Sequence, residues 1–192
     1  MAPQLTEDEI DDLIYFARTG ANDDLHESLT ALAEREKASP AEILLAAEDE
    51  GKSTALHMAA GNGHFETVRT LLGYFQGRPK EERQTFIDEA NEHGNTGLHW
   101  AALGGHLDTV KVLLEHGASP ALANERNYVP LDLANFNDKA EVAAYFLSLS
   151  GGIESSNQEG GLSSAAESIE LVDGGEEEGD EASEATAGAD GK

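Results

Sequence analysis

Apolar residues along this chain recur with the period of short amphipathic helices arranged in pairs. The stretch Thr96–Pro120 shows the pattern most clearly. Apolar positions share one helical face up to Gly104, the Gly104–Gly105 pair interrupts them, and a second stripe runs from Leu107 to Leu114. The glycine pair predicts a tight turn, because glycine adopts backbone conformations that other residues avoid. Two helices this short cannot bury their apolar faces alone, so the pattern predicts a unit that stacks on neighbours.

The same pattern occurs on both sides of this stretch. Thr54-Ala55-Leu56-His57 precedes Thr96-Gly97-Leu98-His99 by 42 residues, and Val129-Pro130-Leu131-Asp132 follows it by 33. The shorter interval is the ankyrin period, and the longer one is that period with a nine-residue insertion. These segments resemble the T-P-L-H motif of the ankyrin-repeat family. The proline is replaced in the first two copies, and the threonine and histidine are lost in the third.

The remaining helical segments complete the predicted stack. Thr6–Glu9 is a capping box ahead of a degenerate first repeat, and Ser39–Glu42 is a second capping box that opens an extra helical turn. The insertion from Gly77 to about Asp88 carries a basic cluster beside two glutamates and is predicted to be a solvated loop. The irregular fourth repeat suits a terminal cap. The resulting fold class is all-α: an ankyrin-repeat solenoid of about four repeats over residues 5–150.

A compositional change at Gly151 marks the second predicted region. Residues 151–192 are dominated by glycine, serine, alanine and glutamate, which bury too little apolar area to offset backbone entropy. The prediction is a disordered acidic C-terminal tail. Within it, Ile169–Val172 matches an apolar strand followed by acids that could dock on a partner's sheet edge, as SUMO-interacting segments do. A match of four residues leaves that role open.

Charge narrows the class of partner. The chain has 38 acidic and 12 basic residues, a net charge of −26, with the excess concentrated in residues 1–50 and 151–192. Such a chain repels nucleic acid and anionic membrane and attracts basic proteins, although acidity can also serve solubility alone. There is no cysteine, and no secretory segment or long apolar span is recognisable. We therefore expect a soluble protein of the cytoplasm and nucleus, with no direct nucleic-acid or membrane contact.

Motifs of catalysis and cofactor binding are not found. Gly51-Lys52-Ser53 lacks the earlier glycine of a phosphate loop, because position 46 is alanine. The repeated histidines have no cysteine or carboxylate partners at zinc spacing. In the ankyrin family the T-P-L-H histidine bonds to backbone within and between repeats, and the resemblance implies that role for His57 and His99. We expect no enzyme, no metal and no cofactor, but a binding protein.

The resemblance also implies where a partner binds. Ankyrin stacks bind through a concave groove formed by loop tips and first helices, and a basic amphipathic helix would suit acidic tips. Met58, Trp100 and Leu133 share one repeat position and are expected to be core. Carried over by position, the partner-binding candidates are Glu48, Asp49, Glu50, Glu92, His93, Leu103, Glu125, Tyr128 and Phe136.

A narrower resemblance rests on the combination of features. The repeats, the Ser39–Glu42 helical insertion and the acidic tail together resemble the fungal ankyrin-repeat chaperones dedicated to small-subunit ribosomal protein three, a basic protein. This implies a dedicated chaperone that binds and protects that protein before its assembly into the ribosome. The client's N-terminal helix would be held by a monomeric chaperone, one to one. The alternative is an ankyrin adaptor or inhibitor of a kinase or transcription factor, which strict repeats and a neutral or mixed-charge groove would favour.

Overall fold

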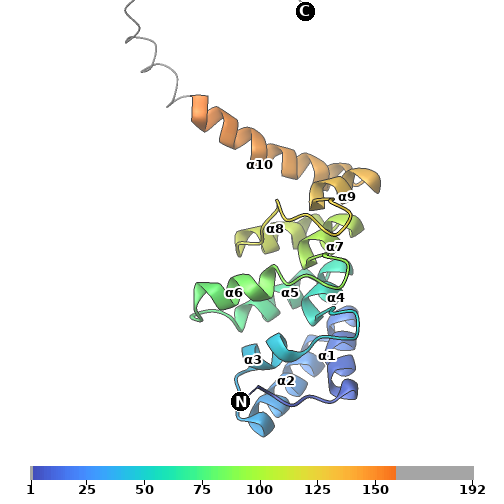
Figure 1. Ribbon diagram of the computed structural model, residues 1–192, viewed down its shortest axis with the longest axis vertical. Coiled ribbons are helices and arrows are strands. Elements are labelled where there is room, and N and C mark those ends of the chain that lie inside the picture. The colour runs from blue at the N-terminus through green and yellow to red at the C-terminus, as the bar shows by residue number, and fades with distance from the viewer. Residues whose placement is uncertain (1, 159–192) are drawn as a thin grey trace, which may run out of the picture. The chain divides into compact units, whose positions relative to one another are not determined.

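Paired helices stacked in register form the body of the protein. The computed structural model describes residues 2–158, with side chains as far as Leu149, and the chain from its N-terminus to Gly152 is one compact unit (Figure 1). The all-α prediction is confirmed for the described residues. The helices are α1 (Glu7–Thr19), α2 (Asn22–Glu36), α3 (Pro40–Ala46), α4 (Ala55–Gly61), α5 (Phe65–Gly73), α6 (Lys80–Ile87), α7 (Gly97–Gly104), α8 (Leu107–Glu115), α9 (Pro130–Phe136) and α10 (Ala140–Gln158).

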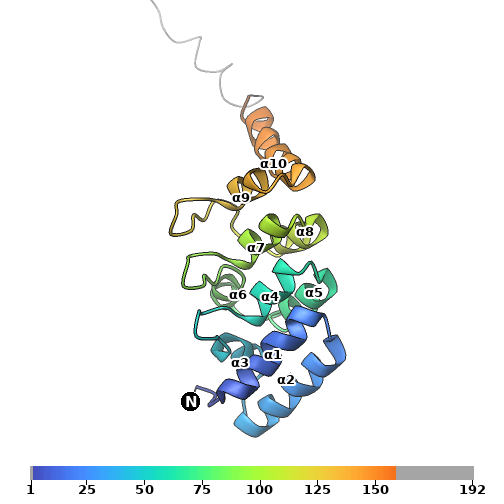
Figure 2. The same cartoon turned by 90° about the vertical axis from the view of Figure 1, so that its right-hand side faces the viewer.

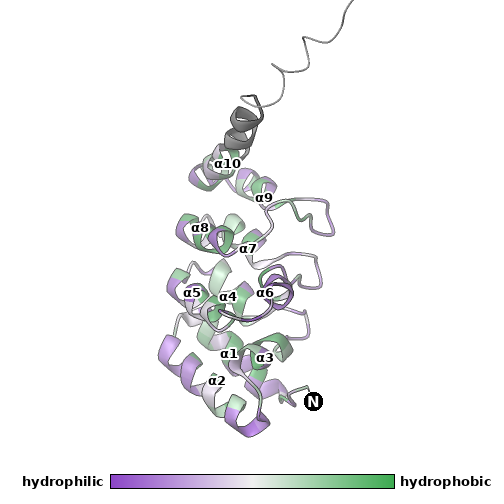
Figure 3. Ribbon diagram, turned by 90° about the vertical axis from the view of Figure 1, so that its left-hand side faces the viewer, coloured by the Kyte–Doolittle hydropathy of each residue, from purple (hydrophilic) through white to green (hydrophobic). Residues whose placement is uncertain are grey.

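The stack has two helical layers and a row of loops. Helices α1, α4, α7 and α9 pack on one another in succession, and α5 packs on α8 in the second layer. The loops that precede α4, α7 and α9 project to the same side (Figure 2). Apolar residues face the interior between the layers (Figure 3). The centre of this core is made of fully buried leucines, among them Leu13, Leu25, Leu56, Leu71, Leu98 and Leu113.

Two buried histidines connect successive repeats. In His57, Nδ1 accepts the Thr54 backbone N–H at 3.1 Å, so Nε2 carries the proton and donates to the Asn95 carbonyl at 2.9 Å. His99 repeats this geometry with the Tyr128 carbonyl at 3.0 Å. Each ring therefore fixes the start of its own helix and the loop of the next repeat, as the resemblance implied.

A second pair of histidines points back toward the preceding repeat. His64 Nε2 contacts the Arg18 carbonyl, and His106 Nε2 contacts the Gly61 carbonyl, both at 2.9 Å. The turn before His64 must be glycine: Gly63 has φ +75°, and a Cβ there would lie 2.5 Å from His106 Nδ1. Lys139 occupies the corresponding place in the fourth repeat, against Gly105.

The insertion after α5 differs from its prediction. It forms a helix, α6, and not a solvated loop, and Phe86 and Ile87 at its end are buried. Phe86 stacks on Phe75 with ring centroids 4.2 Å apart. The charged residues of this segment indicated a solvated loop, whereas its apolar end indicates a buried helix. The acidic first turn also favours a helix through the helix dipole.

The insertion is also tied to the third repeat. Asp88, which follows α6, accepts hydrogen bonds from the Ser119 N–H at 2.9 Å and from its hydroxyl at 2.5 Å. Gln84 on α6 donates to the Gly117 carbonyl at 2.9 Å. The insertion therefore stiffens the stack between the second and third repeats.

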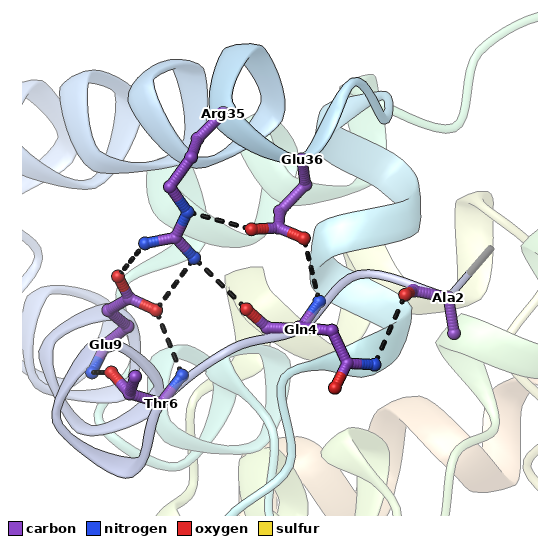
Figure 4. A network of polar contacts seen from close by, with 6 residues as sticks. All are labelled: Ala2, Gln4, Thr6, Glu9, Arg35 and Glu36. Atoms are coloured by element: carbon purple, nitrogen blue, oxygen red, sulfur yellow. Dashed lines mark hydrogen bonds and ion pairs between the residues drawn. The ribbon is translucent and has the colours of Figure 1, made fainter.

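A polar network fastens the N-terminal segment to α1 and α2 (Figure 4). Arg35 on α2 forms an ion pair with Glu9 and donates to the Gln4 carbonyl, while Glu36 accepts the Gln4 N–H. Glu9 also accepts the Thr6 N–H, which completes the predicted capping box. The Arg35 hydrogen bond is the main cause that lowers the pKa of Glu9 to about 2. The first repeat is thereby closed at its outer end.

The C-terminal boundary stays a prediction. Helix α10 runs to Gln158, eight residues past the boundary placed at residue 150. The last buried side chain described is Phe146. The remainder of the predicted tail, including Ile169–Val172, lies outside the described residues. None of the helices in residues 2–158 has the length and hydropathy needed to span a membrane.

Candidate functional site

Two pockets open where the loops meet the first layer of helices. The apolar pocket, of about 380 Å³, lies between α7, α9 and the two loops that precede them. The acidic pocket, of about 530 Å³, lies between α1 and the loop that precedes α4. Together they contain eight of the nine predicted partner-binding residues, so position in the repeat grouped these residues on one side of the stack. Whether these residues bind a partner stays a prediction.

The apolar pocket contains five of those residues. His93, Leu103, Glu125, Tyr128 and Phe136 all line it. Tyr128 and Phe136 pack edge to face with ring centroids 4.9 Å apart, and 62% of Phe136 is exposed. The Tyr128 backbone is held by His99 from below and by Asn124, whose side chain accepts the Tyr128 N–H at 3.0 Å. One ring of the aromatic pair is therefore carried by a loop with fixed backbone, and the other by the end of α9.

Trp100 and Leu133 were expected to be core, and this expectation is wrong for both. They are only partly buried and form the wall of the apolar pocket. Trp100 lies against the preceding repeat, where a Cβ added to Gly61 would be 3.4 Å from the Trp100 Cβ. That distance is an ordinary van der Waals contact, so the side chain of Trp100 packs directly against the end of α4.

One polar atom of the wall is unsatisfied. Trp100 Nε1 is buried and has no hydrogen-bond partner. A buried N–H without a partner typically costs about 1–3 kcal/mol.

The acidic pocket contains three of the acidic candidates together with residues that sequence reasoning missed. Glu48, Asp49 and Glu50 on the loop face Glu7 and Asp11 on α1, and no basic residue lines the pocket. The α1 residues could have been found by aligning Gly20 with Gly63 and Gly105, since each of these glycines lies against the equivalent side chain of the next repeat. That alignment makes α1 a first-layer helix.

Asp49 also has a structural function. Its Oδ1 accepts the Ser53 N–H at 2.7 Å and so closes the loop. Asn91 and Asn124 do the same at the corresponding positions of the next two repeats. Asp49 is therefore a less available partner contact than exposed Glu50.

Glu92 lies in neither pocket but on the edge that connects them. The Glu92 N–H donates to the Gly51 carbonyl at 2.9 Å, and the Glu125 N–H donates to the His93 carbonyl at 3.1 Å. These backbone bonds hold the loop tips in register, so Glu50, Glu92 and Glu125 follow one another along the edge. All three are exposed, and the Glu92 carboxylate lies 3.4 Å from His93 Nε2.

Carboxylates are crowded at the base of the second loop. Burial, and to a smaller extent the charge of Glu48, raise the pKa of Glu89. Desolvation lowers the pKa of His57 and His99, so both rings are neutral in the fold. Among residues 2–158, no three histidine, aspartate or glutamate side chains are placed to hold a metal ion. The site offers carboxylates and aromatic surface, which suit binding.

The architecture of repeated helix pairs with projecting loops defines a class of binding proteins. The family model described as ankyrin repeats (many copies) matches residues 87–134, and the single ankyrin-repeat model matches residues 52–77. The chain is 42% identical over 145 residues to the ankyrin repeat-containing protein YAR1 of Saccharomyces cerevisiae, a match that covers 74% of this chain and 70% of the relative. The chain belongs to the ankyrin-repeat family.

A solved structure carries the similarity further. The fold matches a chain in the crystal structure of the yeast ribosomal protein Rps3 in complex with its chaperone Yar1, with a TM-score of 0.69 and 39% identity. The match covers 76% of this chain and 95% of that one. The matched chain of that complex is therefore covered almost completely.

Proposed function

We propose that this protein is a dedicated chaperone that binds and protects the basic small-subunit ribosomal protein Rps3 before its assembly into the ribosome. The observation that supports this most strongly is the similarity to the yeast chaperone over most of both chains. The charge of the site agrees with it. Five carboxylates line the acidic pocket, and the exposed acids of the loop tips continue from it. A basic helix placed along this edge gains steering and specificity from opposite charge.

The mode of action is binding, with no chemical step. The chaperone acts as a monomer, one to one with its client, and holds the client's N-terminal helix against the loop tips and first-layer helices. It works in the cytoplasm and the nucleus, between synthesis of the client and its assembly. An adaptor or inhibitor of a kinase or transcription factor is the second candidate, but its predicted neutral or mixed-charge groove does not agree with the acidic pocket.

Charge reversal along the edge tests the proposal. The variant Glu50→Lys, Glu92→Lys and Glu125→Lys should lose capture of purified yeast Rps3 at low salt. Binding by the unmodified protein should weaken steeply as salt rises, because the Debye length is about 8 Å at physiological ionic strength. Fluorescence anisotropy of labelled Rps3 over a salt series measures both effects.

The control reverses three exposed acids elsewhere. Asp23, Glu27 and Glu34 lie on α2 and line neither pocket. Changing all three to lysine alters the net charge equally, so this variant should capture Rps3 nearly as well as the unmodified protein. Thermal unfolding should be almost unchanged in both variants, since exposed ion pairs contribute only about 0–1 kcal/mol each. Tight low-salt binding by the edge variant would contradict the edge as the contact surface.

A further inference from the structure

The two pockets differ in chemistry, and charge attraction explains only one of them. The apolar pocket is walled by Trp100, Leu103 and Leu133. The charged residues that line it, Glu125 and Arg126, have opposite signs, so they present no net charge to a basic side chain. This pocket must therefore recognise its occupant by apolar contact.

The aromatic pair at its mouth is unusually open to solvent. Phe136 is 62% exposed and Tyr128 is 37% exposed, and both belong to the large hydrophobic residues that the fold leaves at its surface. Exposed aromatic groups beside a formed apolar pocket mark interaction sites, where they bury large areas on binding. The pocket's volume of about 380 Å³ leaves room for one large side chain.

The register of the stack continues the apolar surface toward the acidic pocket. Each repeat has a residue with left-handed backbone conformation in the turn after its first-layer helix. The residue five positions before that turn residue lies on the first-layer helix. The turn residues are Gly20, Gly63, Gly105 and Asp138, all with positive φ. The row that this defines is Tyr15, Met58, Trp100 and Leu133, of which Tyr15 is 57% exposed.

Helix geometry sets the spacing that an occupant needs. The acidic pocket begins at α1, and the apolar pocket begins at α7. In the first layer α7 is the second helix after α1, so the two pockets are two repeats apart. At roughly 10 Å for each packed helix, this separation is about 20 Å. An α-helix covers that distance in about 13 residues, since it rises 1.5 Å per residue.

We infer that the apolar pocket holds one large apolar side chain of the partner's helix, about 13 residues from the basic side chains over the acidic pocket. The occupant is an amphipathic basic helix, and the inference rests on the function proposed above. The apolar anchor selects the partner and its register, while the acidic edge attracts it. Binding thus has a part that salt weakens and a part that salt leaves unchanged.

The chain provides its own probe of this contact. Trp100 is the only tryptophan of the protein. Binding of yeast Rps3 should shift the Trp100 emission to shorter wavelength and protect it from quenching by acrylamide. The variant Trp100→Phe removes this signal, so its spectrum, recorded at an Rps3 concentration at which anisotropy shows saturation, isolates Trp100 from any tryptophan of Rps3.

A matched pair of variants distinguishes the loss of the pocket anchor from the loss of any exposed apolar side chain. Phe136→Ala combined with Leu103→Ala should weaken Rps3 binding at least about tenfold, as truncation at an interface anchor does. Phe65→Ala removes a ring that is 38% exposed from α5, outside the pocket, and should bind Rps3 like the unmodified protein. The loss in the pocket variant should persist at high salt.

The outcomes distinguish this inference from the proposed function. If the unmodified protein fails to bind Rps3 at any salt, the proposed function and the stated occupant both fail. If Rps3 binds but Trp100 emission is unchanged, the pocket is not the anchor site. Unchanged affinity of the pocket variant would overturn the inference in the same way, with the proposed function intact.

Discussion

Histidine side chains hold adjacent repeats together at the residue scale. His57 and His99 use both ring nitrogens, one for their own helix start and one for the next loop, and both rings are buried. Since the loop reached by His99 carries Tyr128, this bond also supports the mouth of the apolar pocket. Histidine is a common metal ligand, but His57 and His99 here connect adjacent repeats through hydrogen bonds.

Removing either connector should destabilise the fold. We expect His57→Ala and His99→Ala to lower the free energy of unfolding by about 1–3 kcal/mol each, because the buried N–H of Thr54 or Thr96 loses its acceptor and the carbonyl of the next loop loses its donor. Urea denaturation followed by circular dichroism measures this. His116→Ala, at an exposed position after α8, is the control and should cost less. Equal stability of all four proteins would contradict the connector role.

The same histidines predict how stability changes with pH. Desolvation lowers their pKa in the fold from the ordinary 6.5, so the unfolded chain binds more protons near and below that value. Their contribution is complete above pH 6.5 and is lost as the pH falls through the lowered folded-state pKa. The unfolding free energy should therefore fall less between pH 7 and pH 5 in His57→Ala than in the unmodified protein. An identical pH profile would show that His57 is not buried neutral.

The inserted helix α6 shows how an element can change role between sequence and structure. Its exposed face carries the basic residues that favoured a loop, while its end reaches the core through Phe86 and Ile87. The insertion adds contacts with the loop after α8 as well as length. It therefore stabilises the junction that supports the third repeat.

Core substitution in α6 tests that role. Phe86→Ala should lower the free energy of unfolding by about 3–5 kcal/mol, the cost of emptying a buried aromatic site. Arg83→Ala, on the same helix and exposed, should change it by no more than about 0.5 kcal/mol. Equal effects of the two substitutions in urea denaturation would contradict the burial of Phe86 and favour the solvated loop that the sequence predicted.

Acidity is distributed unevenly over the whole molecule. The first 50 residues hold 14 acidic and 3 basic residues, and residues 151–192 hold 12 and 1. The N-terminal excess includes the acidic pocket, whereas the C-terminal excess lies beyond the last described buried side chain, Phe146. The two excesses can thus be separated by shortening the chain.

A chain that ends at residue 150 should unfold within a few degrees of the full protein, because none of the described buried side chains is removed. A chain that ends at Asp138 loses α10 with Val142, Ala143 and Phe146 from the core and should unfold much earlier. Differential scanning calorimetry measures both. A large loss of stability on removing residues 151–192 alone would mean that this region docks on the stack.

The sequence by itself determined the paired helices of the repeats and their repetition, but not the inserted helix α6. Their 3.6-residue apolar period, their capping residues and the 33-residue interval are local features, and a short helix pair with one apolar face has no stable alternative to stacking. The side of the stack that carries the loop tips followed from the same repeat, which is why Glu50, Glu92 and Glu125 were placed on one edge.

Tertiary structure decided what equivalent positions do. Trp100 and Leu133 share a repeat position that reads as core, yet neighbouring repeats leave them as a pocket wall, because exposure depends on the residue that the next repeat places opposite. The acidic pocket joins Glu7 and Asp11 to a loop about 40 residues away, and no local pattern indicates that pairing. Phe86 became core through Phe75 for the same reason: burial is a property of contacts between elements, and these exist only once the repeats have stacked.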